Sequence, residues 1–358
     1  MTDDQSLAWG WLYYALTLCS GTVSSIITKR ISKETAPLPG TYPPIMDYFQ
    51  HPYMMTLFMF IGELLCLPIL YISRLFTSQK SKSNRINPLL CAIPALCDAV
   101  GSALAYNAYN YMAVSIIQML SGIRIIVTAI FSRIFLKTPL HLHHIIGMII
   151  IFLGMAIVGT SAYMDTSGES QPIGFLFLAL SYLLSPIQLI VEEALLSSYT
   201  ANPLEIIGYE GIFGFAFMSL LLVVFQHIPC TRIGKSGSND LYPQTAYCPY
   251  GKIEDSYIGF FQLKHSPTIM EFVMLMIVAL CVLNFSSVGV IKHLKSRVRS
   301  TMSVTQTIII WIINITFQWE QFNCLQFIGF ILSTLGIIIY NEIYFPPIKV
   351  FKYDIKKD

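Results

Sequence analysis

Of the 358 residues in this chain, 54% are hydrophobic and only 12% are charged, and the mean hydropathy is +0.62. This composition is far more apolar than that of a soluble globular protein, and it indicates a protein whose solvent is the lipid bilayer. The formal net charge is only +2, and we expect no nucleic acid among the partners. Residues 1–8 carry two aspartates and no base, so no secretory signal peptide is expected.

Segments long enough to cross a bilayer follow one another along the chain. A helix needs about 20 mostly apolar residues to span the hydrocarbon core. Ten such windows lie at residues 9–28, 52–72, 88–108, 113–135, 143–161, 173–196, 206–226, 268–290, 301–318 and 324–344. The alternating pattern of a membrane β-barrel is absent, so we predict an all-α integral membrane protein with ten transmembrane helices.

The first half of the chain places polar residues inside these apolar windows. Residues 35–50 hold four prolines and are expected to form a luminal loop. Glu63 lies near the middle of the second window, and Asp98 lies near the middle of the third. The fourth window carries a polar stripe within about a third of the helix circumference: Gln118, Ser121, Arg124 and Thr128.

The second half of the chain is more acidic within its windows. Glu192 and Glu193 end the sixth window and Glu205 precedes the seventh, so we expect all three to be solvated near the cytosolic interface. Glu210 lies deeper in the seventh window. Residues 227–267 form the only large extramembrane segment, which is too short and too polar to be a domain.

That segment holds two cysteines, Cys230 and Cys248. If this side of the membrane faces an oxidising lumen, the two are expected to form a disulfide; two free thiols are the alternative. Residues 255–265 of the same segment are expected to lie flat on the membrane, with their aromatic side chains in the interface.

An internal repeat organises the chain. Residues 115–159, shifted by 182 positions, superpose without a gap on residues 297–341. Ten windows divide into five and five, and because five is odd, the second copy enters the membrane from the opposite side. We therefore predict two inverted five-helix repeats, residues 1–161 and residues 162–358, which is an architecture of secondary transporters.

The repeat also superposes particular residues. Gly147 falls on Gly329 and Gly154 falls on Gly336, and glycines seven residues apart on one helix face indicate close helix packing. The polar stripe of the fourth window corresponds to a second stripe in the ninth window: Ser303, Gln306, Thr307 and Asn314. We expect the two stripes to face each other across a central cavity.

Basic residues predict the orientation in the membrane. With the N-terminus in the cytosol, 14 Lys and Arg residues fall on the cytosolic side and 7 on the opposite side, four of these in the long loop. Both termini, including the short tail 345–358, are therefore expected to be cytosolic.

Three ionisable residues, Glu63, Asp98 and Arg124, lie at roughly the midpoint of their windows. A charge at this depth costs at least about 2.5–3.5 kcal/mol and is normally turned inward and paired. The simplest interpretation is a charge triad at the membrane midplane; a purely structural ion pair is the alternative. Two acids against one base leave one carboxyl over, which favours coupling to protons.

No pattern indicates a metal, a cofactor or soluble catalysis. His141, His143 and His144 lie in a short basic turn with no carboxylate or thiol beside them, so no metal is expected there. The motifs GxxxxGK[ST], HExxH and GxSxG are absent. An intramembrane enzyme acting through Glu63 and Asp98, or a non-transporting scaffold, is the alternative from a different class. The repeat argues against an enzyme, because alternating access needs two matched halves and hydrolysis does not.

Several runs of residues together resemble the F subfamily of solute carrier family 35, in the drug/metabolite transporter superfamily. They are FQHP, GELLCL, NPLL, PALCD, QML, VEEALL, GYEGIFGF and LGIIIYNEI. The resemblance covers the chain from Gly21 to Glu342. Relatives carry a base directly after QML, where this chain has Ser121; Arg124, one turn later, takes its place. The resemblance implies ten helices in two inverted EamA-type bundles, a central cavity and a lysosomal or vacuolar membrane, with the Golgi or the endoplasmic reticulum as alternatives.

The charge count bears on the substrate class. A phosphorylated substrate needs several inward-facing bases, whereas this chain offers Arg124 against Glu63, Asp98 and Glu210. We therefore expect a secondary active transporter that moves a cationic or zwitterionic solute with protons by alternating access. A nucleotide-sugar or phosphorylated-metabolite exchanger is the alternative. The expected partners are the small-molecule substrate, protons and membrane lipids, and the expected assembly is a monomer or a homodimer.

Overall fold

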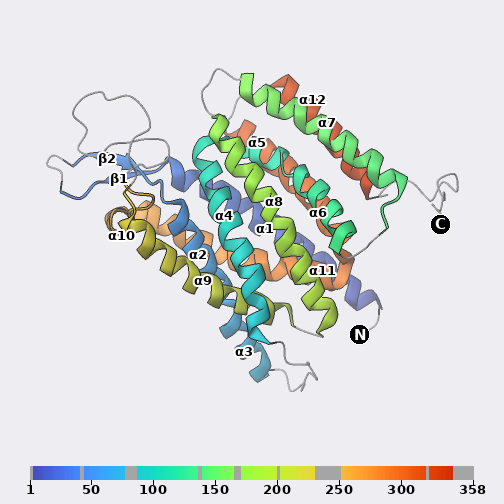
Figure 1. Cartoon of the computed structure of the whole chain (residues 1–358), viewed down its shortest axis with the longest axis horizontal. Coiled ribbons are helices and arrows are strands. Elements are labelled where there is room, and N and C mark those ends of the chain that lie inside the picture. The colour runs from blue at the N-terminus through green and yellow to red at the C-terminus, as the bar shows by residue number, and fades with distance from the viewer. Residues whose placement is uncertain are drawn as a thin grey trace.

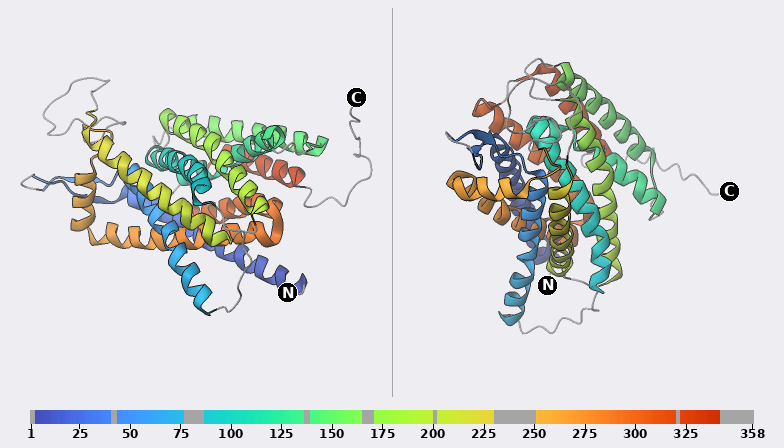
Figure 2. Two further views of the ribbon diagram at one scale, coloured as in Figure 1. Left: turned by 60° about the horizontal axis from the view of Figure 1, so that its bottom comes forward. Right: turned by 60° about the vertical axis from the view of Figure 1, so that its left-hand side comes forward.

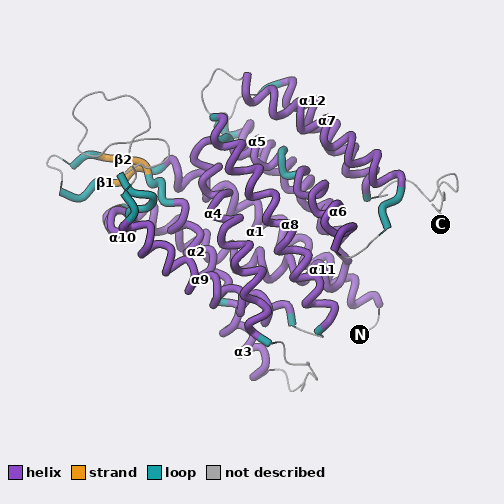
Figure 3. Tube along the Cα trace, in the orientation of Figure 1, coloured by secondary structure: helices purple, strands orange, loops and turns teal. Residues whose placement is uncertain are grey.

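The computed structural model describes residues 3–40, 44–76, 87–135, 139–164, 171–199, 202–229, 251–319 and 322–341. These residues are almost entirely helical, with one short pair of strands (Figures 1 and 3). In chain order the elements are α1 (Asp3–Lys33), β1 (Thr35–Pro37), β2 (Met46–Tyr48), α2 (Pro52–Leu64), α3 (Cys66–Phe76), the 3-10 helix η1 (Pro88–Cys91), α4 (Ala92–Tyr111), α5 (Val114–Met119), α6 (Gly122–Phe135), α7 (Leu142–Met164), α8 (Pro172–Ser198), α9 (Pro203–His227), α10 (Ser256–His265), α11 (Pro267–Thr316) and α12 (Cys324–Tyr340).

The apolar windows are helical because a helix pairs its backbone N–H and C=O groups within itself, which lipid requires. Within the described residues, seven segments are long and apolar enough to cross a membrane: Pro52–Ile72, Pro88–Tyr111, Val114–Phe135, Leu142–Met164, Pro172–Glu192, Leu204–His227 and Pro267–Val290. The three other predicted windows fall on α1, on the C-terminal part of α11 and on α12. The all-α membrane fold is thus confirmed.

Several helices begin where the local sequence supplies a cap. The side chains of Asn87, Asn202 and Asn323 each accept a hydrogen bond from the backbone N–H two residues later, at 3.1, 3.1 and 2.9 Å. Proline follows the first two asparagines at the first helical position, where its missing N–H costs nothing. These caps set where η1, α9 and α12 begin.

Two of the predicted windows contain an interruption of the helix. In the second window, α2 gives way to α3 at the single residue Leu65, two residues after the acidic residue Glu63, although Leu65 keeps a helical backbone conformation. In the fourth window, α5 ends at Met119 and α6 begins at Gly122, with Ser121 buried between them. Interrupted helices bring side chains and backbone groups to membrane depth, which is where transporters build binding sites.

Helix α11 cannot be straight. Thr17 and Tyr14, one turn apart on α1, contact two distant points of α11: Thr17 Oγ1 lies 2.8 Å from Ser286 Oγ, and the Tyr14 hydroxyl lies 3.3 Å from Thr305 Oγ1. A straight helix would hold residues 286 and 305 about 28 Å apart. The helical run therefore folds back on itself between these residues, and both of its arms lie beside α1.

The helices pack in pairs that have a regular relation to the predicted windows. Helix α1 packs on α11 and α4 packs on α8, while α2 packs on α9 and α7 packs on α12. These pairs join the first window to the eighth, the third to the sixth, the second to the seventh and the fifth to the tenth. Exchanging each window with the one five places along leaves this set of pairs unchanged. Figures 1 and 2 show α7 and α12 side by side at one edge of the bundle.

The α7–α12 crossing has the same reciprocity at the level of residues. A Cβ added to Gly154 would lie 2.6 Å from the Gly329 carbonyl oxygen, and one added to Gly329 would lie 2.7 Å from the Gly154 carbonyl oxygen. Gly147 and Gly336 oppose each other in the same way, at 2.8 and 2.9 Å. The two helices are therefore antiparallel, and the prediction that these four glycines allow close packing is confirmed.

The segment predicted to be a luminal loop contains a small sheet. Strands β1 and β2 pair antiparallel, with Ala36 opposite Asp47, so residues 35–37 and 46–48 are more ordered than the proline content of the segment indicates. The prolines still limit the strands, since both end within three residues. Helix α10 lies beside the sheet, with Ile258 and Leu263 buried and Tyr257 exposed.

A buried hydrogen-bond network ties α10 to the start of α2. His51 Nδ1 pairs with a carboxylate oxygen of Glu254, and His51 Nε2 lies 3.1 Å from Gln262 Oε1. The second Glu254 oxygen accepts the Tyr53 backbone N–H at 3.4 Å. All three polar side chains of the network are buried, and buried polar groups hold their neighbours in place when they are paired.

Asp255 caps α10 and lies outside the predicted spans. Burial pushes the pKa of its carboxyl upward, but hydrogen bonds from Gln226 Nε2 at 3.0 Å and from Lys252, with the Lys252 charge at 3.1 Å, outweigh the burial. The pKa of Asp255 therefore lies below its ordinary value. The cap stays ionised under mildly acidic conditions.

Candidate functional site

Four carboxyl groups from four different helices gather inside the bundle. The side chains of Glu63 of α2 and Asp98 of α4 interact with each other at close range. Glu192 of α8 and Glu210 of α9 are close enough to interact electrostatically with Glu63. Two ionised carboxylates at close range repel each other, so this arrangement of acids is costly unless a proton or a cation compensates it.

Neutral donors surround these acids. Asn284 of α11 donates from Nδ2 to Glu63 Oε1 at 2.7 Å, and Ser102 donates from Oγ to Asp98 Oδ1 at 2.6 Å. Gln188 of α8 also hydrogen-bonds Asp98. Lys and Arg form no ion pair with Glu63 or Asp98 within the described residues. The donors that contact Glu63 and Asp98 among the described residues are therefore neutral side chains.

Glu192 and Glu210 complete the carboxyl cluster, by which we mean Glu63, Asp98, Glu192 and Glu210. Glu192 was expected to be solvated, yet it is buried and its Oε1 accepts a hydrogen bond from Gln188 Nε2 at 2.8 Å. The deeper position expected for Glu210 agrees with its burial. Glu210 Oε1 and Glu63 Oε2 are buried oxygens that meet no hydrogen-bond donor among the described residues.

Glycine brings α2 and α9 close together at this depth. A Cβ added to Gly211, the residue after Glu210, would lie 2.6 Å from the Leu64 backbone nitrogen and 3.0 Å from Glu63 Cβ. Any larger residue at this position would separate the two helices that carry Glu63 and Glu210. Glu210 thus supplies a carboxyl group to the cluster, and Gly211 allows the two helices to approach each other closely.

The remaining acids near the end of α8 and the start of α9 differ from Glu192. Glu205 was expected to be solvated; it forms an ion pair with Arg74 at 2.9 Å, in which the Arg74 side chain is 56% exposed but the Glu205 side chain only 13%. The side chain of Glu193 lies outside the described part of the structure. Among the described residues, no group of three His, Cys, Asp or Glu side chains is arranged to hold a metal ion.

Arg124 lies apart from the carboxyl cluster. Its guanidinium carbon is 5.1 Å from the centroid of the Tyr182 ring, a cation–π contact. It also acts electrostatically on the hydroxyl of Tyr109. The structure does not bring Arg124 together with Glu63 and Asp98 as the predicted triad required. The reason is that Arg124 reaches α8 at Tyr182, whereas the acids reach that helix further along.

The two predicted polar stripes meet. Gln118 Nε2 donates to Ser25 Oγ at 3.1 Å and to the Tyr109 hydroxyl at 3.4 Å. The Gln118 carbonyl oxygen accepts a hydrogen bond from Thr307 Oγ1 at 3.4 Å. Gln306, one residue earlier, packs its amide against Gly21, where a Cβ would lie 3.0 Å away. The stripes therefore adjoin α1 and α4 as well as each other.

Of the three remaining stripe residues, the structure describes the side chains of two. Thr128 Oγ1 donates to the Arg124 carbonyl oxygen at 2.6 Å, within its own helix. Asn314 is buried in α11. The side chain of Ser303 lies outside the described part of the structure, as do Cys230 and Cys248, so the disulfide stays a prediction.

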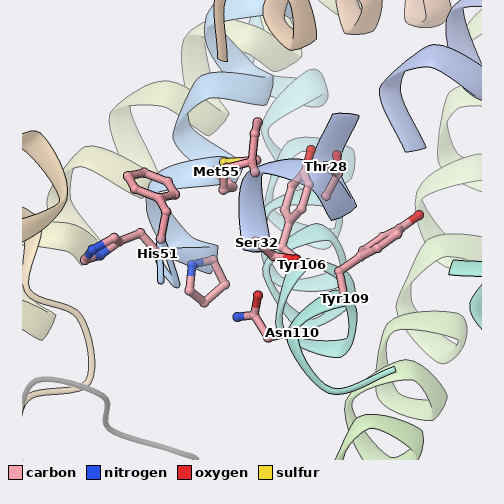
Figure 4. A pocket seen from close by; sticks show the side chains of 10 residues that line it. Thr28, Ser32, His51, Met55, Tyr106, Tyr109 and Asn110 are labelled. Carbon is pink, nitrogen blue, oxygen red and sulfur yellow. The ribbon is translucent and has the colours of Figure 1, made fainter. Parts of the chain in front are cut away.

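A small pocket lies at the end of the bundle near the strands (Figure 4). Thr28 and Ser32 of α1, Met55 of α2, and Tyr106 and Tyr109 of α4 line it, together with His51 and Asn110. Tyr109 belongs both to this pocket and to the Gln118 network. The pocket therefore adjoins the interior polar residues from the side opposite the carboxyl cluster along α4.

Sequence reasoning missed several members of the site. Asn284, Gln188 and Ser102 are single polar residues inside apolar windows, a signal that was present but that did not indicate their partners. Cys66 and Cys281 lie in apolar windows where nothing in the sequence indicates a contact, yet their sulfur atoms lie 3.9 Å apart and both interact with Glu63. All six cysteines in the described residues are free.

Comparison with known proteins gives a consistent result. Residues 38–160 match the model of the EamA-like transporter family. The chain is 32% identical over 308 residues to solute carrier family 35 member F6 of Homo sapiens, covering 83% of this chain and 80% of that protein. It is 31% identical over 341 residues to the same protein of Mus musculus, covering 92% and 88%. An uncharacterized protein of Schizosaccharomyces pombe is 27% identical over 259 residues, covering 70% and 74%.

Proposed function

The chain belongs to solute carrier family 35 of the drug/metabolite transporter superfamily, and from this premise we propose that it is a proton-coupled transporter of small cationic or zwitterionic solutes. The observation that carries the proposal is the gathering of the Glu63, Asp98, Glu192 and Glu210 carboxyls inside the bundle, with neutral side chains as their hydrogen-bond donors. Such a cluster can hold a proton, and it can release that proton when a cation approaches or when a path to water opens.

The proposed transport cycle is alternating access between two inverted halves of five helices. Two observations support this architecture. The helix pairs are unchanged when the first five windows are exchanged with the last five. At the α7–α12 crossing, each contact between a residue of one copy and a residue of the other occurs twice, with the copies exchanged. We propose that residues 1–161 and 162–358 are these two halves.

The proposed coupling is competition between protons and the positive group of the substrate. With the carboxyl cluster protonated, the site has little affinity for a cation. When a proton leaves to the side of higher pH, an ammonium group binds the carboxylate in its place. Buried oxygens without a donor, Glu63 Oε2 and Glu210 Oε1, are the acceptors that such a group would satisfy.

The sign of the interior charge supports this substrate class over phosphorylated compounds. A phosphate or a nucleotide needs several donors with positive charge. The described interior offers four clustered carboxyl groups with neutral donors around them, and Arg124 stands apart with Tyr182. The resemblance to the family also leads us to propose an endomembrane location, in a lysosome or vacuole, where a standing proton gradient would drive the cycle.

Uptake into proteoliposomes tests the proposal. The purified protein is reconstituted, and labelled amino acids, amines, short peptides and nucleotide sugars are supplied with and without an imposed pH gradient. We expect a cationic or zwitterionic solute to accumulate only with the gradient. Asp98→Asn should abolish gradient-driven uptake, because an amide cannot release a proton. Glu271→Gln, at an exposed carboxyl outside the cluster, is the matched control and should transport as the wild type does.

Two results would overturn the proposal. One is transport of nucleotide sugars alone, by exchange and without response to pH. The other is an Asp98→Asn protein that retains full gradient-driven uptake of a cationic solute. Because Asn preserves the shape of Asp, a folded but uncoupled protein is the expected phenotype, and thermal unfolding of the purified variant verifies that it is folded.

A further inference from the structure

The interior of the bundle separates its negative charge from its positive charge. The carboxyl cluster has neutral donors, Asn284, Ser102 and Gln188, and Arg124 has the ring of Tyr182. Within the described residues no ion pair joins Arg124 to a carboxylate. An arginine and several acids that share a membrane interior normally pair with one another, because an unpaired charge there is costly. Their separation is therefore a feature that needs a reason.

The distance between the two charged regions can be estimated along helix α8, because this helix contacts both of them. Tyr182, which holds Arg124, comes six residues before Gln188 and ten before Glu192. At 1.5 Å per residue these intervals are about 9 and 15 Å along the helix. Helix α4 shows the same order, with Asp98 in the cluster and Tyr109 beside Arg124, about 16 Å further along its axis.

Several polar side chains of both charged regions are not fully buried. Asp98 and Gln188 at the negative end, and Arg124, Tyr109 and Gln118 at the positive end, all keep partial exposure although they lie on helix faces that contact other helices. Two buried carboxylate oxygens of the cluster also lack a hydrogen-bond donor among the described residues. Tyr109, on which the Arg124 charge acts, also lines the small pocket near the strands.

We propose, building on the transporter function above, that the substrate is an elongated zwitterion whose carboxylate binds Arg124 and whose ammonium group binds the carboxyl cluster. Such a molecule satisfies both charged regions at once, whereas a simple amine or a simple acid satisfies one. Glu192 lies about 15 Å from Tyr182 along α8, and the contact of each charge with its partner takes up about 3 Å, so the two charges of the substrate must be about 9 Å apart. A chain residue spans about 3.3–3.6 Å when extended, so three residues of peptide match this distance and a single amino acid does not.

The glycine series tests this length requirement without side-chain effects. Glycine, diglycine, triglycine and tetraglycine are compared as ligands of the purified protein by the rise in its thermal unfolding temperature, and as labelled substrates in proteoliposomes. We expect triglycine to bind at least about tenfold more tightly than glycine. N-acetyl-triglycine and triglycinamide, which lack one charge each, should each lose at least about tenfold, as expected when a buried charge loses its partner.

Substitutions of Arg124 assign the carboxylate end. In Arg124→Gln, triglycine and triglycinamide should bind equally, because the residue that distinguishes them is gone. Arg124→Lys should restore part of the preference for the free carboxylate. The comparison of ligands in the wild-type protein needs no variant, so the proposal can be tested even where a variant fails to fold.

The outcomes separate this inference from the function on which it rests. If a cationic solute moves with protons but binding is independent of length and of the terminal carboxylate, the transporter function stands and the bipolar substrate is wrong. An Arg124→Gln protein that still prefers triglycine over its amide is equally contrary to it. If no solute of any charge moves, the proposed function itself fails.

Discussion

The α7–α12 crossing predicts opposite effects for two alanine substitutions on one helix. A Cβ at Gly154 would lie 2.3 Å from Ser333 Oγ, 2.5 Å from the Ser333 backbone nitrogen and 2.6 Å from the Gly329 carbonyl oxygen. A Cβ at Gly159 would meet nothing within 4 Å. Two of the three neighbours of Gly154 are backbone atoms, so rotation of a side chain cannot relieve the clash. The two helices must move apart.

The size of the effect follows from these distances. Ordinary contact begins at 3.4 Å, so α12 must retreat by about 0.9 Å, a gap that forfeits a quarter to a half of the dispersion energy of the contacts around it. Overpacked substitutions of this kind cost about 1–3 kcal/mol. At Gly159, alanine instead favours the helix by up to about 1 kcal/mol. Gly154→Ala and Gly159→Ala should therefore differ in stability by about 2–4 kcal/mol.

Thermal unfolding of the protein purified in detergent measures this difference. We expect Gly154→Ala to unfold at a lower temperature than the wild type, and Gly159→Ala to unfold at the same or a higher temperature. Gly329→Ala, on the facing helix, should behave like Gly154→Ala because its Cβ would lie 2.7 Å from the Gly154 carbonyl oxygen. If Gly154→Ala proves as stable as Gly159→Ala, the close antiparallel contact between the two copies of the repeat is refuted.

Three further predictions concern other contacts. Asn284→Leu should destabilise the protein by about 1–3 kcal/mol, because Glu63 Oε1 loses its donor; the double variant with Glu63→Leu should recover most of the loss in chemical unfolding, and additive losses would contradict the pairing. Oxidation of membranes with copper phenanthroline should join Cys66 to Cys281, whose sulfur atoms are 3.9 Å apart, and mass spectrometry should find the linked peptide in the wild type but not after Cys66→Ser. Since the pKa of Asp255 is lowered, the stability that Asp255 contributes is present above its unfolded pKa of 3.8 and is lost as the pH falls through the lower folded value. The difference in unfolding temperature between wild type and Asp255→Ala should therefore hold steady from about pH 7 to pH 5 and shrink below about pH 4. A difference that disappears at pH 5 would show that the pKa is not lowered.

Where local sequence is decisive, the sequence was a sufficient guide. Apolar runs of about 20 residues predicted helices in the places where they occur, because lipid leaves the backbone no other way to pair its polar groups. The spacing of Gly147 and Gly154, repeated at Gly329 and Gly336, predicted close packing, because glycines seven residues apart share one helix face. The helix starts at Asn202 and Asn323 are likewise local, because their caps involve only the next few residues.

Contacts between helices were beyond the reach of the sequence. Periodicity indicates which face of a helix is polar, but it cannot say which other helix that face meets. Arg124, like Glu63 and Asp98, lies near the middle of its predicted window, but the packing of α6 on α8 places it beside Tyr182. The sequence predicts that Glu192 is a solvated acid near the membrane interface, but the packing of α8 buries it among other carboxyl groups. The residues in the membrane were thus determined by the sequence itself, whereas the arrangement of their charges was decided by tertiary packing, because only the assembled bundle brings together groups separated by a hundred residues or more.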